Sequence, residues 1–287
     1  MTDNDLSLST RRGLIHFRRP KVMGIINVTP DSFYDGSRTP DSDEISSRVR
    51  RMREEGADMI DIGGYSSRPG ADDVSPDEEY SRLARGLECI RREWPEAIVS
   101  VDTFRASTAR RCVEEWEADI INDISGGTLD AEMWPTVASL KCGYVLMHMR
   151  GTPATMQQHT DYNDVTADVI SDLAHKAFTL HSMGVADIII DPGFGFAKTS
   201  EQNFRLLAML DEFKKMGMPV LAGMSRKTMI WKTLSITPAE SLEGTVALNT
   251  VALMKGADIL RVHDVLPAAQ TVKLMTALRE AECQSNH

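Results

Sequence analysis

Three polar side chains come directly after stretches rich in Val and Ile, and their types suit recognition of a flat polar ligand. Asp102, Asn122 and Asp191 are these residues. A carboxylate accepts two N–H groups side by side, and a side-chain amide both donates and accepts. Together they can read the amidine-like edge of a heterocyclic ring. The alternatives are that each one only caps the next helix or turn, or that the carboxylates bind a metal, although no His or Cys accompanies them at ligand spacing.

Two cations and two hydroxyls lie together in the segment Gly223-Met224-Ser225-Arg226-Lys227-Thr228. An Arg and a Lys beside hydroxyl groups are typical of an anion-binding site. Lys227 is equally compatible with a Schiff-base lysine, as in barrel aldolases. The residues alone leave both interpretations open.

Arg68, Arg261 and His263 are candidates for an anion clamp, because Arg forks match phosphate oxygens. A lone Arg is usually a solvated surface charge, but Arg261 follows an apolar stretch, where a strand end points inward. His263 taken alone favours a structural role, and so does His148. The segment 191–196 adds a tight loop with two Gly and two Phe, of which one ring is expected in the core.

Eight apolar runs, each ending in Gly or a polar residue, must position these side chains. They are 22–26, 59–62, 98–101, 120–121, 144–147, 188–190, 220–224 and 259–262. Helical patterns fill the gaps, among them a capped helix from Ser75 to about Arg92, a second from Thr237 to about Lys255, and a third over 163–183. This alternation predicts a parallel sheet, and eight units predict a (β/α)8 TIM barrel with its active site at the C-terminal face of the strands.

The turns between helices and strands repeat one pattern. The segments 56–58, 117–119, 184–187 and 256–258 each join a helix to a strand, and Gly in three of them provides a left-handed cap. No linker divides the chain. We therefore expect a single domain, with an N-terminal tail over 1–19, the barrel over 20–280 and a C-terminal tail over 281–287.

The bulk composition narrows the class of protein. The chain has 287 residues and a formal net charge of −10, which argues against nucleic acid or an anionic membrane as the main partner. Four Cys residues show no metal-ligand spacing and are expected to be reduced thiols of a cytoplasmic protein. Neither a signal peptide nor a run of about 18 apolar residues is apparent.

With these segments assembled, the chain resembles the dihydropteroate synthase family over about 21–278. The motifs that carry the resemblance occur in order: Asn27-Val28-Thr29-Pro30-Asp31-Ser32-Phe33, Ser66-Ser67-Arg68-Pro69-Gly70, Ser100-Val101-Asp102-Thr103, Ile121-Asn122-Asp123, Met147-His148-Met149-Arg150-Gly151, Asp191-Pro192-Gly193-Phe194-Gly195-Phe196, Gly223-Met224-Ser225-Arg226-Lys227 and Arg261-Val262-His263-Asp264. Each motif alone is moderate evidence, whereas the ordered set is highly specific.

The resemblance implies an enzyme that condenses 6-hydroxymethyl-7,8-dihydropterin diphosphate with p-aminobenzoate, giving 7,8-dihydropteroate and diphosphate in folate biosynthesis by a dissociative displacement. It implies catalytic roles for Asp102, Lys227, Arg261 and His263. The implied pterin site is Asp102, Asn122, Ile124, Met147, Asp191, Phe196, Gly223, Lys227 and Arg261. The implied diphosphate site is Asn27, Ser67, Arg68, Arg261 and His263, with Mg²⁺ at Asn27. The implied p-aminobenzoate site is Phe33, Ser67, Pro69, Phe196, Lys227 and Thr228.

The resemblance also implies a homodimer and competition by sulfonamides. The chain departs from the commoner family residues at Tyr65, Ser67, Ala197 and Thr228. Ser67 and Thr228 retain a hydroxyl, so the chemistry is expected to survive. Two alternatives are a corrinoid methyltransferase-type pterin domain, in which an anion clamp would have no purpose, and a non-catalytic pterin-binding paralogue.

Overall fold

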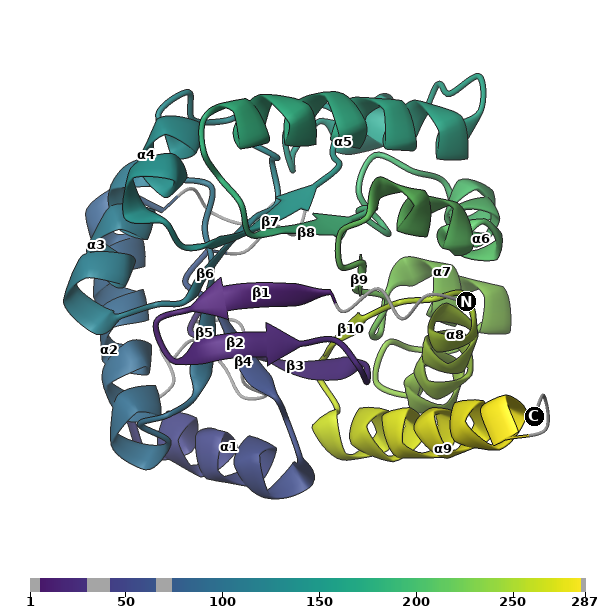
Figure 1. Cartoon of the computed structure of the whole chain (residues 1–287), viewed down its shortest axis with the longest axis horizontal. Helices are drawn as coiled ribbons and strands as arrows, with labels where there is room; N and C mark the ends of the chain where they lie inside the picture. Colours follow the sequence, from purple (N-terminus) through teal and green to yellow (C-terminus); the bar gives the residue numbers. More distant parts are fainter. Residues whose placement is uncertain (1–5, 30–41, 66–73, 285–287) are drawn as a thin grey trace.

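Eight parallel strands form a nearly closed barrel in the computed structural model, which describes residues 6–29, 42–65 and 74–284 (Figure 1). The strand order is β8-β7-β6-β5-β4-β3-β10-β9, and a bridge between Ile190 and Val220 joins the two ends. The strands are β3 (Lys21–Asn27), β4 (Met59–Gly63), β5 (Ile98–Asp102), β6 (Ile120–Asp123), β7 (Gly143–Met147), β8 (Ile188–Asp191), β9 (Leu221–Ala222) and β10 (Ile259–Val262). The predicted TIM barrel is confirmed.

Helices surround the strands, as Figure 1 shows. They are α1 (Ser42–Glu55), α2 (Pro76–Glu93), α3 (Ala106–Trp116), α4 (Met133–Leu140), α5 (Val165–Ser182), α6 (Ser200–Ala208), α7 (Thr228–Leu234), α8 (Leu242–Met254) and α9 (Val265–Gln284), with 3-10 turns at Met156–Gln158 and Leu210–Met216. The predicted cap of α2 is confirmed, because the Ser75 hydroxyl accepts a hydrogen bond from the Glu78 amide at 3.2 Å. The last helix extends to Gln284, past the predicted boundary at residue 280.

The predicted start of the next capped helix at Thr237 is wrong. The Glu240 carboxylate accepts hydrogen bonds from both the Thr237 amide and the Thr237 hydroxyl, at 2.9 and 2.7 Å. The hydroxyl therefore donates to a side chain and does not cap the helix. A tight turn forms over these residues, and α8 begins only at Leu242.

The three predicted turns that contain Gly adopt the expected left-handed conformation, and the fourth does so without Gly. Gly56, Gly184 and Gly256 have φ values of +92°, +92° and +89°, and Glu117 has a φ of +53°. Each turn leads directly into a barrel strand. These turns set where the next strand begins, and so fix which of its residues point into the barrel.

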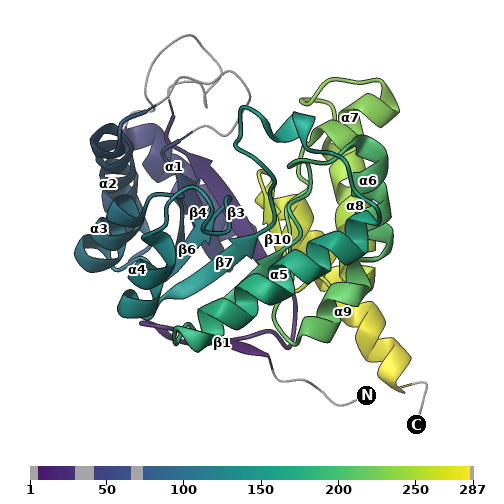
Figure 2. The same ribbon diagram turned by 90° about the horizontal axis from the view of Figure 1, so that it is seen from above.

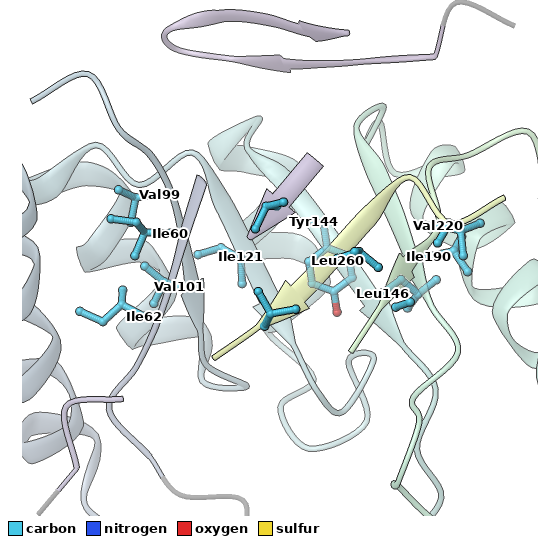
Figure 3. Packing of buried hydrophobic residues seen from close by; sticks show 14 of the residues in the cluster. Ile60, Ile62, Val99, Val101, Ile121, Tyr144, Leu146, Ile190, Val220 and Leu260 are labelled. Carbon is cyan, nitrogen blue, oxygen red and sulfur yellow. The ribbon is translucent and has the colours of Figure 1, made fainter. Parts of the chain in front are cut away.

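Alternation along the strands separates two apolar layers. One set of strand residues packs outward against the helices, among them Ile60, Ile62, Val99 and Val101 (Figure 3). The residues between them point to the barrel axis. At the N-terminal end of the axis these are apolar, namely Met23, Met59, Ile120, Val145, Ile189, Leu221 and Ile259.

A β-hairpin covers this end of the barrel, where the sequence predicts only a tail. It consists of β1 (Ser7–Thr10) and β2 (Gly13–His16), and Figure 2 shows β1 beneath the barrel strands. Leu8 and Ile15 pack onto the inner apolar layer, and Leu8 is only 1 % exposed. The N-terminal end of the axis is therefore closed by apolar packing, and the polar residues that point to the axis lie toward the opposite end. No helix of the described part of the chain is long and apolar enough to cross a membrane.

Candidate active site

The C-terminal ends of the strands bring an acidic and basic set together on the barrel axis. Strand register pairs Gly63 with Asp102, and Asp102 with Asn122. Farther around the sheet Met147 pairs with Asp191. Because Ile60 and Ile62 face the helices, Asp61 between them faces the axis. Strand β10 contributes Arg261 to the same interior.

Arg261 is held by two carboxylates. Its Nε and Nη2 both lie 2.6 Å from Oδ2 of Asp61, and Nη2 also lies 2.6 Å from Oδ2 of Asp102. The sequence prediction that Arg261 points inward is thus confirmed. A single guanidinium therefore links β10 with β4 and β5, past the intervening strand β3.

Asp61 is a buried residue of this site that the sequence analysis missed. Its side chain is 0 % exposed and accepts hydrogen bonds from the Ser100 hydroxyl at 2.6 Å and from Nδ2 of Asn122 at 3.2 and 3.3 Å. A signal was present, since a carboxylate interrupts the apolar run 59–62. These contacts direct the amide nitrogen of Asn122 toward Asp61.

Burial and neighbouring charges shift the pKa values of the charged groups in this site. Burial raises the pKa of Asp102, the Arg261 guanidinium lowers it, and the nearby Asp61 carboxylate raises it again. Burial also raises the pKa of Asp191, and Lys227 opposes that shift. Burial lowers the pKa of Lys227 to about 8, against the attraction of Asp191. Carboxylates and cations therefore compensate one another in a largely dehydrated space.

Lys227 lies against the loop that follows β8. Its ammonium donates a hydrogen bond to the Phe194 carbonyl and lies 4.8 Å from the centre of the Phe196 ring. A Cβ at Gly223 would lie 3.9 Å from both Lys227 Nζ and Arg261 Cβ, so Gly223 lies beside both side chains. The predicted core ring is Phe194, which is fully buried.

An apolar wall adjoins these charges. Ile124, Met147 and Phe196, all predicted to line the ligand, belong to one cluster with Met149 and Ala197. Apolar side chains at this end suit a flat ring, whereas the N-terminal end is filled by aliphatic packing. Thr228, the first residue of α7, is exposed.

A buried lysine fixes the loop from behind. Lys198 is 3 % exposed, and its Nζ lies 3.0 Å from Nδ1 of His148, 3.1 Å from the Gly193 carbonyl and 3.0 Å from the Phe196 carbonyl. Three acceptors match the three hydrogens of an ammonium group. His148 is therefore structural, as predicted, while no pattern in the sequence points to Lys198.

His263 and Arg226 differ in their hydrogen-bond partners and in their charge. The Ser225 hydroxyl accepts a hydrogen bond from the His263 amide at 3.2 Å and lies 3.1 Å from its Nδ1. Burial, followed by the charge of Arg261, lowers the pKa of His263 to about 4, so the ring is neutral at pH 7. Arg226 instead forms a fork with the Asp264 carboxylate, at 2.8 and 2.9 Å. Of the two cations in this segment, Lys227 alone lies beside Asp191.

Asn27 and Asp102 lie on either side of Gly63, on the two strands that pair with β4. A Cβ at Gly63 would lie 3.5 Å from Oδ1 of Asn27 and 3.5 Å from Cβ of Asp102. Among the described residues, no group of three or more His, Cys, Asp or Glu side chains could hold a metal ion.

A cavity of about 250 Å³ lies beside α1 and is lined by Arg48, Arg51 and His263 among others. Phe33, Ser67, Arg68 and Pro69 lie outside the described residues.

Tyr65 and Ala197, two of the residues that differ from the commoner family residues, make contacts that the structure describes. Tyr65 packs edge-to-face on Phe104, with ring centres 5.2 Å apart. Ala197 has a φ of +50°, in the left-handed region that favours glycine, and its carbonyl accepts a hydrogen bond from the Tyr162 hydroxyl at 3.0 Å. The preference for Gly at this position therefore has a backbone cause.

Comparison with known proteins agrees with this geometry. A family model described as "Pterin binding enzyme" matches residues 23–263. The dihydropteroate synthase of Synechocystis sp. is 43 % identical over 264 residues, covering 91 % of each chain. The crystal structure of Yersinia pestis dihydropteroate synthase with a sulfonamide drug has a TM-score of 0.90 and 36 % identity, covering 96 % of this chain and 100 % of that one. The Thermus thermophilus enzyme in complex with 4-aminobenzoate has a TM-score of 0.84 and 36 % identity, covering 95 % and 99 %.

A parallel barrel with a mixed acidic and basic site at its C-terminal face is thus an enzyme scaffold, and the chain belongs to the pterin-binding enzyme family. The relatives it matches within that family are dihydropteroate synthases.

Proposed function

We propose that this protein is a dihydropteroate synthase. It would join 6-hydroxymethyl-7,8-dihydropterin diphosphate to p-aminobenzoate and release diphosphate. The observation that carries the proposal is the pairing of a ring-reading set, Asp102, Asn122 and Asp191, with Arg261 on the same axis. A pterin-binding domain without a diphosphate substrate has no need of an anion-binding Arg at the position of Arg261.

The pterin ring would lie against the apolar wall of Ile124, Met147 and Phe196. Asp102 and Asp191 would accept its N–H groups, the Asn122 amide oxygen would face it, and Lys227 would donate to it. Because these groups are largely removed from water, each hydrogen bond would discriminate strongly against a ring with the wrong donor pattern.

The diphosphate would lie toward Asn27, Arg261 and His263. Ser67 and Arg68, which lie outside the described residues, would also contribute. Donors aimed at the leaving oxygen would stabilise the charge that develops as the C–O bond breaks. The amine of p-aminobenzoate would then attack the pterin cation. Aniline nitrogen is already nucleophilic, so no general base is required. Phe33, Ser67, Pro69, Phe196, Lys227 and Thr228 would form the p-aminobenzoate site, where sulfonamides would compete.

Mg²⁺ fits the described residues only as an ion shared with the substrate. The Asn27 amide oxygen is a hard ligand over Gly63, whereas the described residues hold no cluster that would bind a metal alone. When bound, the ion would neutralise diphosphate charge.

The test is a coupled assay for diphosphate release, with and without p-aminobenzoate. Release that requires the amine supports a synthase. Binding of the pterin without release in either condition would instead favour a non-catalytic paralogue. Transfer of a methyl group to a corrinoid protein would favour the methyltransferase-type domain.

We also propose a homodimer that forms through α8 and α9. These packed helices expose large apolar side chains, including Met254 at 67 % and Leu274 at 72 %. Such a surface is costly in water and suits a second copy of the chain. Sedimentation velocity should give a dimer for the wild type and a monomer for Leu274→Glu. A monomeric wild type would contradict the proposal.

We further propose a cytoplasmic location. Cys89, Cys112 and Cys142 are buried free thiols, and burial raises the pKa of Cys112 and Cys142 to about 12. Unreactive reduced thiols are usual where disulfides do not form. Fractionation of cells that express the protein would test this location.

A further inference from the structure

Two groups would compete for the Asp102 carboxylate when the ligand binds: the Arg261 guanidinium and the edge of the pterin ring. Arg261 Nη2 lies 2.6 Å from Oδ2 of Asp102 in this ligand-free state. The pterin edge, under the proposed function, needs the same carboxylate. Binding would therefore replace at least part of the Arg261 contact by ring N–H groups.

A second carboxylate remains with Arg261 when that exchange occurs. Asp61 contacts both Nε and Nη2 of Arg261 at 2.6 Å, and its side chain is 0 % exposed, against 22 % for Asp102. Asp61 is thus too deeply buried to meet a ligand. It can act on the ligand only through the groups that it touches.

Those groups are on both sides of the proposed pterin site. Asp61 accepts from Arg261 on β10 at Oδ2, and from the Asn122 amide on β6 and the Ser100 hydroxyl on β5 at Oδ1. The carboxylate therefore fixes which way the Asn122 amide is turned. It also stabilises the positive charge of Arg261 inside the barrel. Burial of the guanidinium without a counter-charge would cost free energy.

We propose that Asp61 is a positioning residue that holds Arg261 and Asn122 in place while Asp102 exchanges Arg261 for the pterin ring. This inference rests on the proposed function. Asp61 neutralises Arg261 throughout, which frees Nη2 to turn from Asp102 toward the leaving diphosphate.

Asp61→Asn is the first test, because it keeps the shape of the side chain and an acceptor for Asn122 while removing the charge. Arg261 would then rely on Asp102 alone and compete with the ring. We expect Kd and KM for the pterin diphosphate to rise ~10- to 100-fold, the scale of a lost charged hydrogen bond. KM for p-aminobenzoate should change less than about threefold, since its proposed site does not include Asp61.

Ser100→Ala is the matched control. It removes one hydrogen bond from the same carboxylate at 2.6 Å and leaves the contact with Arg261. We expect Kd for the pterin diphosphate to stay within about threefold of wild type. An equal loss in both variants would mean that Asp61 serves only general packing, and it would overturn the proposal.

The pH profile separates positioning from packing. Asp102 is faced by Arg261 from β10, Asp61 from β4, Glu79 from α2 and Asp123 from β6. Loss of the Asp61 charge removes one influence that raises the pKa of Asp102 and leaves Arg261 to lower it. The acid limb of kcat/KM for the pterin diphosphate should therefore move to lower pH in Asp61→Asn. An unmoved limb contradicts the proposal.

A double variant covers the case in which Asp61→Asn folds poorly. Arg261→Met with Asp61→Asn removes both buried charges together, which proteins tolerate better than the loss of one. If Asp61 acts through Arg261, the double variant should have the kcat/KM of Arg261→Met alone. Additive losses would overturn the proposal.

The two proposals fail in distinguishable ways. A wild type that binds the pterin diphosphate but releases no diphosphate refutes the synthase activity, and the Kd comparison still decides the role of Asp61. An active wild type with an unchanged Asp61→Asn variant refutes only the positioning role.

Discussion

At the scale of single residues, the site is a set of charges whose strength depends on neighbours far away in the chain. Arg261 reaches Asp61 and Asp102 because β10 and β4 both pair with β3, and β5 follows β4 in the sheet. The sequence predicts that Arg261 and Asp102 face the axis, since each ends an apolar run. Their contact with each other is not predictable, because a strand pattern carries no information about which side chains of other strands meet inside the barrel. Asp61 is not predicted, because the segment 59–62 has the character of an apolar run even though a carboxylate interrupts it.

Replacement of Asp102 by Asn should weaken pterin binding. The variant keeps the shape but loses the charge that accepts two ring N–H groups, so we expect Kd for 6-hydroxymethylpterin to rise ~10- to 100-fold by calorimetry. Asp77→Asn, on a side chain that is 99 % exposed, is the matched control and should bind as wild type. Equal affinity of the Asp102 and Asp77 variants would remove Asp102 from the ligand site.

The raised pKa of Asp102 predicts a pH dependence of that binding. Burial is the largest cause of the shift, and it makes the carboxyl hold its proton to a higher pH than usual. Because ring recognition requires the ionised form, affinity should be full above the raised pKa and decline as pH falls through it, starting well above the ordinary carboxyl range of about 4. Calorimetric titrations at several pH values would show this decline in wild type. The same decline in Asp102→Asn would assign it to another group.

Ser225 should control the proton on His263. Its hydroxyl accepts from the His263 amide, so its own hydrogen is available to Nδ1, and the ring proton is then on Nε2. Ser225→Ala removes this control, and kcat/KM for the pterin diphosphate should fall about fivefold, the equivalent of one neutral hydrogen bond of ~1 kcal/mol. Ser182→Ala on α5 is the control. In a His263→Ala background the Ser225 change should have no further effect, and an additional loss there would contradict the tautomer assignment.

At the scale of elements, local chemistry decides what the sequence can predict. The αβ turns at Gly56, Gly184 and Gly256 follow from glycine at a left-handed cap, and all three adopt it. The start of α8 was misplaced because Glu240 reaches back to Thr237 and uses up the predicted cap. Residues 7–16 are expected to be a tail because their sequence lacks strong strand patterning, and their hairpin is stabilised by the packing of Leu8 and Ile15 on the barrel.

Lys141 offers a test of the cap principle at an exposed site. It closes α4 with a φ of +52°, a conformation that costs a residue with a Cβ roughly 1–2 kcal/mol. Lys141→Gly should therefore raise the free energy of unfolding by about 1 kcal/mol, after the greater chain entropy of Gly in the unfolded state is subtracted. Urea denaturation measures this change. Lys141→Ala keeps the Cβ and should give no gain, and a similar gain from both would refute the backbone explanation.

At the scale of the whole molecule, the barrel separates stability from chemistry. At its N-terminal end the residues on the axis are apolar and a hairpin covers them, whereas at the C-terminal end the residues on the axis include Asp61, Asp102 and Arg261. Packing at one end can therefore vary while the other keeps its geometry. Such a separation is expected of TIM barrels, in which the C-terminal loops carry function.

Leu8 puts this separation to the test, because it is 1 % exposed at the far end from Asp102. Leu8→Ala removes buried methyl groups and leaves a cavity, so the free energy of unfolding should drop by about 2–4 kcal/mol. Leu14 on the same hairpin is 61 % exposed, and Leu14→Ala should change it by less than about 0.5 kcal/mol. At temperatures where both variants remain folded, kcat and KM for the pterin diphosphate should equal those of wild type. A loss of kcat in Leu8→Ala without unfolding would show that the hairpin and the catalytic end are coupled through the strands.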